Sequence, residues 1–81
     1  MNPRKFQEAL FRGNRDANLD FDSMRRYLTA LGFEERSKGS HFVFRVPGIG
    51  RPLNLQPRAS HCKAYQVRQV RKVLAELNMR L

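Results

Sequence analysis

The residue best suited to acid–base chemistry in this sequence is His41. It follows Gly39 and Ser40, and Lys38 and Arg45 place positive charge on both sides of it. An imidazole gives and takes protons near neutral pH. RNA cleavage needs little more, because the 2′-hydroxyl is an internal nucleophile, a base removes its proton, and cations stabilise the transition state. His41 is therefore a candidate general acid–base; the competing interpretation is a histidine that only forms a hydrogen bond at the start of a strand.

Other combinations of reactive residue types are weaker. His61 and Cys62 are adjacent in a polar loop, but two neighbours without further ligands make neither a nucleophilic pair nor a metal site. We interpret them as part of a solvated loop, with contact to a substrate left open. The neighbouring acids resemble surface and capping groups, namely Glu34, Glu35, Asp20 and Asp22. No metal site is expected.

The charge of the chain points to a polyanionic partner. The formal net charge is +9 and the sequence pI is about 11.1. Residues 36–75 contain no acid, and their nine cations are Arg36, Lys38, Arg45, Arg51, Arg58, Lys63, Arg68, Arg71 and Lys72. Clustered cations at such a pI are typical of nucleic-acid binding, and the alternative is a solubilising surface. No expected helix pairs a broad apolar face with a Lys-rich one, so a membrane is not expected as partner.

Length and cysteine content predict one domain in a reducing compartment. The 81 residues leave room for a single core. Cys62 is the only cysteine, so no internal disulfide can form. We find no apolar run of signal-peptide or membrane-spanning type. The expected location is therefore the cytoplasm.

The patterning predicts two helices before any strand. Residues 3–12 form a short helix that Gly13 ends, and residues 14–19 form a polar connection. Asp20 is the expected N-cap of a second helix, since its carboxylate accepts from the unpaired N–H groups of the first turn. Gly32 stops this helix in a left-handed conformation.

The rest of the chain predicts three strands and a helix. The strands cover residues 33–37, 41–46 and 53–56, with a turn at 47–50 and a loop at 57–64, and the last helix covers residues 65–78. The fold class is α+β, with a three-stranded antiparallel sheet and two helices packed on one face. Because side chains alternate between the two faces of a strand, one set is expected to face the helices, namely Phe42, Phe44, Leu53 and Leu55. The other set is expected to face outward, namely His41, Val43, Arg45, Asn54 and Gln56.

The last helix carries further candidates for phosphate contact. Arg68 and Lys72 share a face at i,i+4 spacing, and Arg71 is their neighbour. For each of them a solvated helix face is the alternative. Tyr65 and Gln66 at the start of the helix cap it, pack or touch RNA, and the residues do not decide between these roles.

The order of several short motifs resembles the HicA-type mRNA interferase family of toxin–antitoxin systems. The motifs are Gly32-Phe33, Gly39-Ser40-His41 followed by Phe44, Asn54-Leu55-Gln56-Pro57, and Lys63-Ala64-Tyr65-Gln66-Val67-Arg68-Gln69-Val70. The resemblance begins at about Phe21 and runs to the end of the chain. It divides the domain of residues 1–81 into a core of residues 20–81 and an N-terminal extension of residues 1–15.

The resemblance implies a fold, an activity and partners. The implied fold resembles a double-stranded-RNA-binding domain, and the implied activity is a metal-independent endoribonuclease acting on mRNA with His41 as the catalytic residue. The implied protein partner is an antitoxin of the HicB type, and the resemblance implies no cofactor. The expected RNA contacts are Lys38, Ser40, Arg45, Lys63, Arg68, Arg71 and Lys72. This chain departs from many members at Phe42, where they carry a second histidine, and at Ala64, where they carry proline.

Two other functions fit the same residues. A non-catalytic RNA-binding module would use the same fold and charge without cleavage. A protein-interaction or DNA-associated domain would act only through a partner. Incubation of the purified chain with RNA in chelator separates the first alternative from an enzyme, and strong RNA binding by the isolated chain counts against the second.

Overall fold

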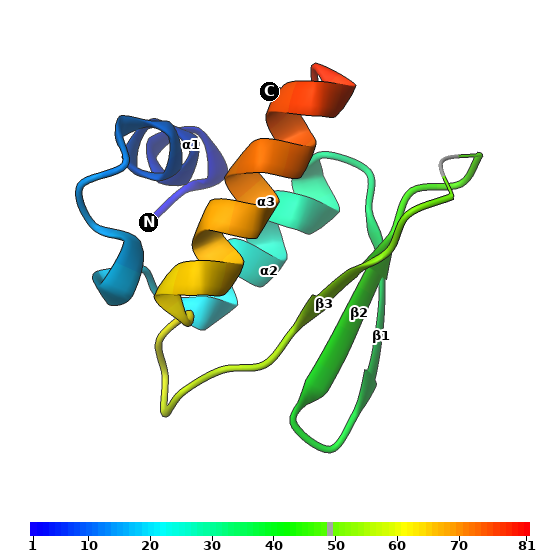
Figure 1. The fold of residues 1–81 in the computed structure, drawn as a ribbon, viewed down its shortest axis with the longest axis horizontal. Helices are drawn as coiled ribbons and strands as arrows, with labels where there is room; N and C mark the ends of the chain where they lie inside the picture. Colours follow the sequence, from blue (N-terminus) through cyan, green and yellow to red (C-terminus); the bar gives the residue numbers. More distant parts are fainter. Residues whose placement is uncertain (49) are drawn as a thin grey trace.

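The computed structural model describes residues 1–48 and 50–81, and its elements follow the expected order. The elements are α1 (Pro3–Arg12), η1 (Asp16–Asn18), α2 (Phe21–Ala30), β1 (Glu34–Lys38), β2 (His41–Arg45), β3 (Leu53–Leu55) and α3 (Ala64–Leu77). The strands form one antiparallel sheet in the order β1-β2-β3 (Figure 1). The predicted α+β class with a three-stranded antiparallel sheet is confirmed. The likeness to a double-stranded-RNA-binding domain stays a prediction, and the predicted turn at 47–50 includes Ile49, which lies outside the described residues.

The helices gather on one side of the sheet, and no described element covers its other side (Figure 1). The sheet presents Phe44, Leu53 and Leu55 to the helices, and each of these side chains is at most 3% exposed. Burial of one such side chain stabilises the fold by roughly 1.5–3 kcal/mol. The strand alternation predicted from the sequence therefore leaves one face of the sheet open to solvent.

The first helix, α1, belongs to the same hydrophobic core as the rest of the chain. Phe6 and Leu10 are almost completely buried. The ring centroid of Phe6 lies 5.3 Å from that of Tyr27 in α2, and the Tyr27 hydroxyl donates a hydrogen bond of 2.8 Å to Oε1 of Gln7. The N-terminal extension implied by the resemblance thus packs tightly against the core.

Residues 14–19 differ from the polar connection expected there. They contain the 3-10 turn η1, and Leu19 is only 1% exposed. The carbonyl of Leu19 accepts a 2.8 Å hydrogen bond from the backbone N–H of Cys62. The polar composition of residues 14–19 did not predict this packing, because the buried Leu19, its backbone contact and the Asp16–Arg71 ion pair all involve partners far away in the chain.

The end of α2 explains why β1 starts one residue later than predicted. Gly32 has a φ of 104°, and its N–H donates to the carbonyl of Thr29. The N–H of Phe33 donates to the carbonyl of Leu28, which completes the Schellman pattern of a helix end. Phe33 is therefore used to terminate the helix, and the strand begins at Glu34.

Candidate functional site

His41 is exposed and is the first residue of β2. The register places it directly opposite Lys38, the last residue of β1. Only Gly39 and Ser40 connect the two strands, and Gly39 has a φ of 61°. A two-residue hairpin turn of type II′ needs a positive φ at its first position, which glycine adopts without steric cost. The imidazole is thus held at a tight hairpin and is open to solvent.

Lys38 and Arg36 share the outer sheet face with His41. Residues opposite each other on neighbouring strands point to the same face, and side chains alternate along each strand. Lys38 is opposite His41, and Arg36 is opposite Val43, so both cations project outward with His41. Arg36 was not among the expected RNA contacts. Strand alternation, counted back two residues along β1 from Lys38, would have placed Arg36 on this face.

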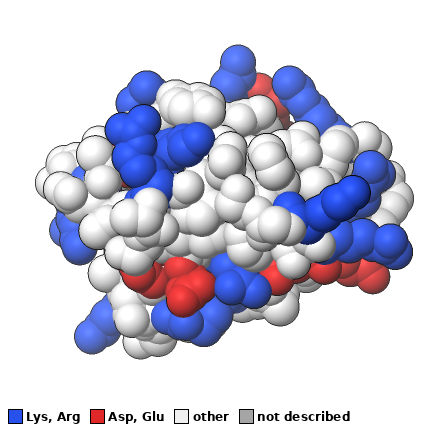
Figure 2. All heavy atoms as spheres, turned by 90° about the horizontal axis from the view of Figure 1, so that it is seen from below, with Lys and Arg blue, Asp and Glu red and all other residues white. Residues whose placement is uncertain are grey.

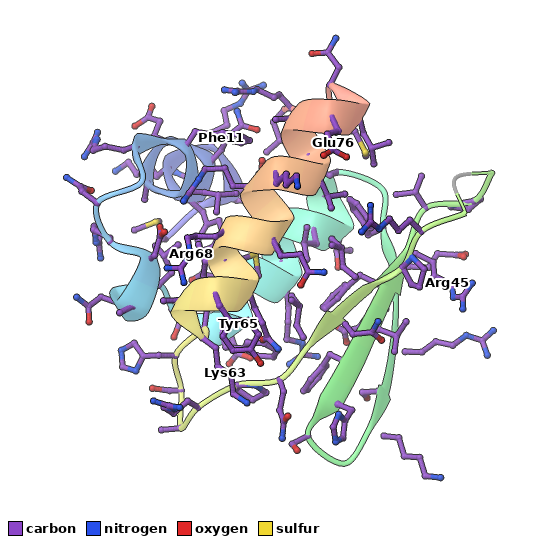
Figure 3. All side chains as sticks on the ribbon, viewed as in Figure 1. Phe11, Arg45, Lys63, Tyr65, Arg68 and Glu76 are labelled. Atoms are coloured by element: carbon purple, nitrogen blue, oxygen red, sulfur yellow. The ribbon has the colours of Figure 1, made fainter. Side chains whose placement is uncertain are left out.

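Arg45 lies on the same face but at the other end of β2. It lies four positions along β2 from His41, which corresponds to roughly 13 Å. Its partner across the strands is Glu34. A hollow of about 510 Å³ is lined by Glu34, Arg36, Val43 and Arg45. In Figure 3 the Arg45 side chain points away from the helices. Arg45 is therefore further from His41 than the sequence suggested, and it has the acidic residue Glu34 beside it. Both features make it a weaker candidate for contact with RNA bound at His41.

A chain of polar side chains connects the hairpin to the start of α3. Nε2 of Gln56 donates to the Ser40 hydroxyl at 3.2 Å, and Nζ of Lys63 donates to Oε1 of Gln56 at 3.5 Å. The backbone N–H of Gln56 donates to Oε1 of Gln66 at 3.0 Å, and Gln66 is 8% exposed. The buried Gln66 amide therefore fixes the end of β3, and with it the polar groups beside His41.

An ion pair holds the inner side of β1 against α2, and an aromatic contact holds the inner side of β2 against the same helix. Phe42 packs edge-on against Phe21, with ring centroids 4.9 Å apart, and the Arg25 guanidinium lies 4.9 Å from the Phe42 centroid. Nε and Nη2 of Arg25 both donate to Glu35 at 2.8 Å. These hydrogen bonds hold the pKa of Glu35 below its usual value. Both strands of the hairpin that carries His41 are thereby fastened to α2.

Arg71 is engaged in a structural contact. Its guanidinium donates to both carboxylate oxygens of Asp16 and to the carbonyl of Leu10, each at 2.9 Å. The hydrogen bond from Arg71 holds the pKa of Asp16 below its usual value. Arg68 and Lys72 are exposed on the same helix. Because three of its five N–H groups already donate within the fold, we leave Arg71 out of the candidate RNA surface and keep Arg68 and Lys72.

The expected RNA contacts fall into two groups. Lys38, Ser40 and Arg45 belong to the sheet and its β1–β2 hairpin, whereas Lys63, Arg68 and Lys72 lie at the start of α3 and along it. Figure 3 shows Lys63, Tyr65 and Arg68 together there, well apart from Arg45. On the face drawn in Figure 2, cations occur near both ends of the molecule, and acidic groups lie mainly in a band along one side. The positive charge forms separate surfaces rather than one patch.

The His61–Cys62 pair does not form a nucleophilic site. Cys62 is 5% exposed, and its thiol contacts the backbone carbonyl of Asp20 at 3.8 Å. Burial raises the pKa of the Cys62 thiol to about 12, so thiolate is scarce at neutral pH. His61 is exposed, and its Nδ1 lies 3.5 Å from the Ser60 hydroxyl. His61 remains available as a surface group without an activated partner thiol.

Within residues 1–48 and 50–81, no three His, Cys, Asp or Glu side chains are grouped so that they could hold a metal ion. Across the same residues, no helix is both long enough and apolar enough to cross a membrane. No protein-family model, no curated protein and no solved structure matches this chain.

Proposed function

We propose that this chain is an endoribonuclease toxin of the HicA type that cleaves mRNA in the cytoplasm and is neutralised by an antitoxin of the HicB type. The observation that carries the proposal is the exposed imidazole of His41 at the β1–β2 hairpin, on an open sheet face that it shares with Lys38 and Arg36. A general base needs access to its substrate, and a polyanion needs cations to hold it. The open sheet face combines an accessible imidazole with cations.

The proposed reaction uses the RNA's own 2′-hydroxyl. His41 in its neutral form takes the proton from this hydroxyl, and the 2′-oxygen attacks the adjacent phosphorus. The bond from phosphorus to the 5′-oxygen breaks, which leaves a 2′,3′-cyclic phosphate and a 5′-hydroxyl end. The imidazolium then gives this proton to the departing 5′-oxygen. A single imidazole thus acts first as the general base and then as the general acid.

The neighbours of His41 have separate roles in this proposal. Lys38 stabilises the extra negative charge on the phosphoryl oxygens as the 2′-oxygen attacks. Ser40 and Gln56 are positioning residues, since their hydrogen bond ties the hairpin to the end of β3. Phe42 faces the helices, so the lack of a second histidine at this position removes no group from the face that carries His41.

The decisive test compares the two histidines of the chain. Purified wild type, His41→Ala and His61→Ala are incubated with single-stranded RNA in chelator, and initial cleavage rates are measured. Loss of one general acid–base group lowers a rate by roughly 10²–10⁴-fold, so we expect this loss for His41→Ala only. RNA with 2′-deoxy residues should resist cleavage, and expression of His41→Ala should no longer inhibit growth.

Two outcomes would contradict the proposal. If His41→Ala keeps the wild-type rate while circular dichroism shows both proteins folded, His41 is not the general base. Wild type that binds RNA but yields no fragments would instead support a non-catalytic RNA-binding module.

A HicB-type partner that forms a complex with the chain should protect RNA in the same assay, because it would cover the open sheet face.

A further inference from the structure

A second hollow, which the proposed cleavage does not use, lies beside the start of α3. It measures about 480 Å³ and lies between residues 58–63 and the first turns of the helix. Three cations line it, namely Arg58, Lys63 and Arg68, together with His61 and Tyr65. None of the described residues that line it is acidic. A hollow with this lining suits a ligand that carries negative charge.

Tyr65 gives this hollow an aromatic wall. Its side chain is 58% exposed, and the other described large apolar or aromatic residues with high exposure are Met1 and Leu81, the first and last residues. The Tyr65 hydroxyl accepts a 3.4 Å hydrogen bond from Nε2 of Gln66, which restrains the ring. Arg68 is at i+3 and therefore lies on the same helix face. An exposed ring beside cations is the arrangement on which unpaired nucleobases stack.

The loop that forms the floor of the hollow is held by the backbone. The N–H of Arg58 donates to the carbonyl of His61 at 2.9 Å, and the N–H of His61 donates to the carbonyl of Arg58 at 3.0 Å. The next residue, Cys62, is tied to Leu19 by a 2.8 Å backbone hydrogen bond. The cations are therefore presented on a preformed surface, which reduces the entropy lost when a ligand binds.

Lys63 connects this hollow to the surroundings of His41. It lines the hollow, and its Nζ donates to Gln56, whose amide donates to Ser40 next to His41. The route between the two places thus consists of polar groups able to contact the backbone of one nucleic-acid strand.

From these contacts we infer that the hollow is a second nucleotide subsite, in which an unpaired base of a single-stranded RNA stacks on Tyr65 while Arg58 and Arg68 hold the adjacent phosphate. The inference rests on the proposed function, because the same strand would present its scissile phosphate to His41. Single-stranded RNA is the ligand class, since a base inside a duplex cannot stack on a protein ring.

Binding is measured on the full chain carrying His41→Ala, by fluorescence anisotropy with single-stranded RNA and with a duplex of the same sequence. Base–aromatic stacking corresponds to roughly 5- to 150-fold in affinity. We expect Tyr65→Ala to lose affinity in this range for single strands and to change duplex binding little. Tyr65→Phe should retain wild-type affinity, because stacking uses the ring and not the hydroxyl.

The cations are tested with a charge-matched pair. Arg68→Ala and Arg4→Ala each remove one positive charge, but Arg4 lies on α1 outside this hollow. We expect a clear loss of single-strand affinity for Arg68→Ala and a smaller one for Arg4→Ala. Circular dichroism of each variant checks the fold. The subsite is overturned if folded Tyr65→Ala binds single strands as tightly as its parent, or if it loses equal affinity for the duplex.

Cleavage by chains with an intact His41 separates this inference from the proposed function. Tyr65→Ala should cleave a dinucleotide at the parental rate and show a raised KM only on longer RNA. If His41→Ala still cleaves but Tyr65→Ala weakens single-strand binding, the subsite stands and the catalytic proposal falls. If His41 is essential for cleavage and Tyr65→Ala has no effect on binding, the catalytic proposal stands and the subsite falls.

Discussion

Lys38 and Arg36 carry the same charge on the same sheet face, yet the register relates them differently to His41. Lys38 is the direct cross-strand partner of His41, whereas Arg36 is opposite Val43. Facing pairs have Cβ atoms roughly 4.5–5.5 Å apart, and residues two positions further along a strand are beyond that range. In the proposed function, Lys38 is therefore placed to reach the phosphate at His41, and Arg36 is placed to contact the RNA strand further along.

This difference predicts separate kinetic effects for two matched substitutions. Lys38→Gln should lower kcat on a short RNA by about 10-fold or more, because a transition-state contact is removed; buried oxyanion donors cost about 10²–10³-fold, and this one is exposed. Arg36→Gln should leave kcat nearly unchanged and raise KM on longer RNA. Steady-state kinetics on short and long substrates measures both effects. Equal losses of kcat in the two variants would contradict the assignment of Lys38.

At the scale of elements, η1 is attached to α3 by one ion pair. The Arg71 guanidinium and the Asp16 carboxylate form two parallel hydrogen bonds of 2.9 Å, and their side chains are 24% and 14% exposed. Arg71 also donates to the carbonyl of Leu10 near the end of α1. Two parallel donors to one carboxylate make a stronger and more directional contact than a single exposed ion pair. This contact keeps α1 and η1 against the helix that carries Arg68.

Removal of the Asp16 charge should destabilise the fold in a pH-dependent way. Asp16→Asn should lower the free energy of unfolding by about 1–2 kcal/mol near neutral pH. The folded pKa of Asp16 lies below its unfolded value, so its contribution is fully present above the unfolded pKa and is lost as the pH falls through the folded pKa. Urea unfolding from about pH 7 down to about pH 2 should show the two proteins converging in acid.

Asp22→Asn is the control for this measurement. The Asp22 carboxylate is 68% exposed and pairs with Arg25 at 3.1 Å. Exposed pairs contribute little, so we expect a loss of about 0.5 kcal/mol or less. A similar loss in both variants would mean that the geometry of the Asp16 pair adds nothing to stability.

The sequence predicted the elements well because their signals are local. The Asp20 side chain accepts a hydrogen bond from the Ser23 N–H at 2.9 Å, as expected of an N-cap. Strand alternation predicted that Phe44 faces the helices, and Phe44 is buried there. The engagement of Arg71 was missed, since its partner Asp16 is 55 residues away in the chain. The hollow beside Tyr65 was also missed. Its wall combines a loop with a helix turn, and such proximity follows from tertiary packing.

At the scale of the whole molecule, the net charge of +9 is divided over separate surfaces. Lys38 and Arg36 lie on the open sheet face, whereas Lys63 and Arg68 lie beside the start of α3. A cation affects the salt dependence of RNA binding only where it neutralises a phosphate and releases its counterion. Salt dependence therefore separates contacting cations from those that merely raise the net charge.

Double substitutions of equal charge should therefore give unequal salt slopes. For single strands the slope of log K against log salt is about −0.7 per phosphate neutralised, so removal of two contacting cations should reduce it by about 1.4. We expect this change for Arg36→Ala with Lys38→Ala, and again for Lys63→Ala with Arg68→Ala. The control replaces the α1 cations Arg4 and Lys5, and should leave the slope near the parental value. Titrations over a range of salt, on the cleavage-deficient His41→Ala background, measure all three. A slope that fell equally in every pair would mean that RNA senses only the total charge, and that neither surface holds the strand at defined positions.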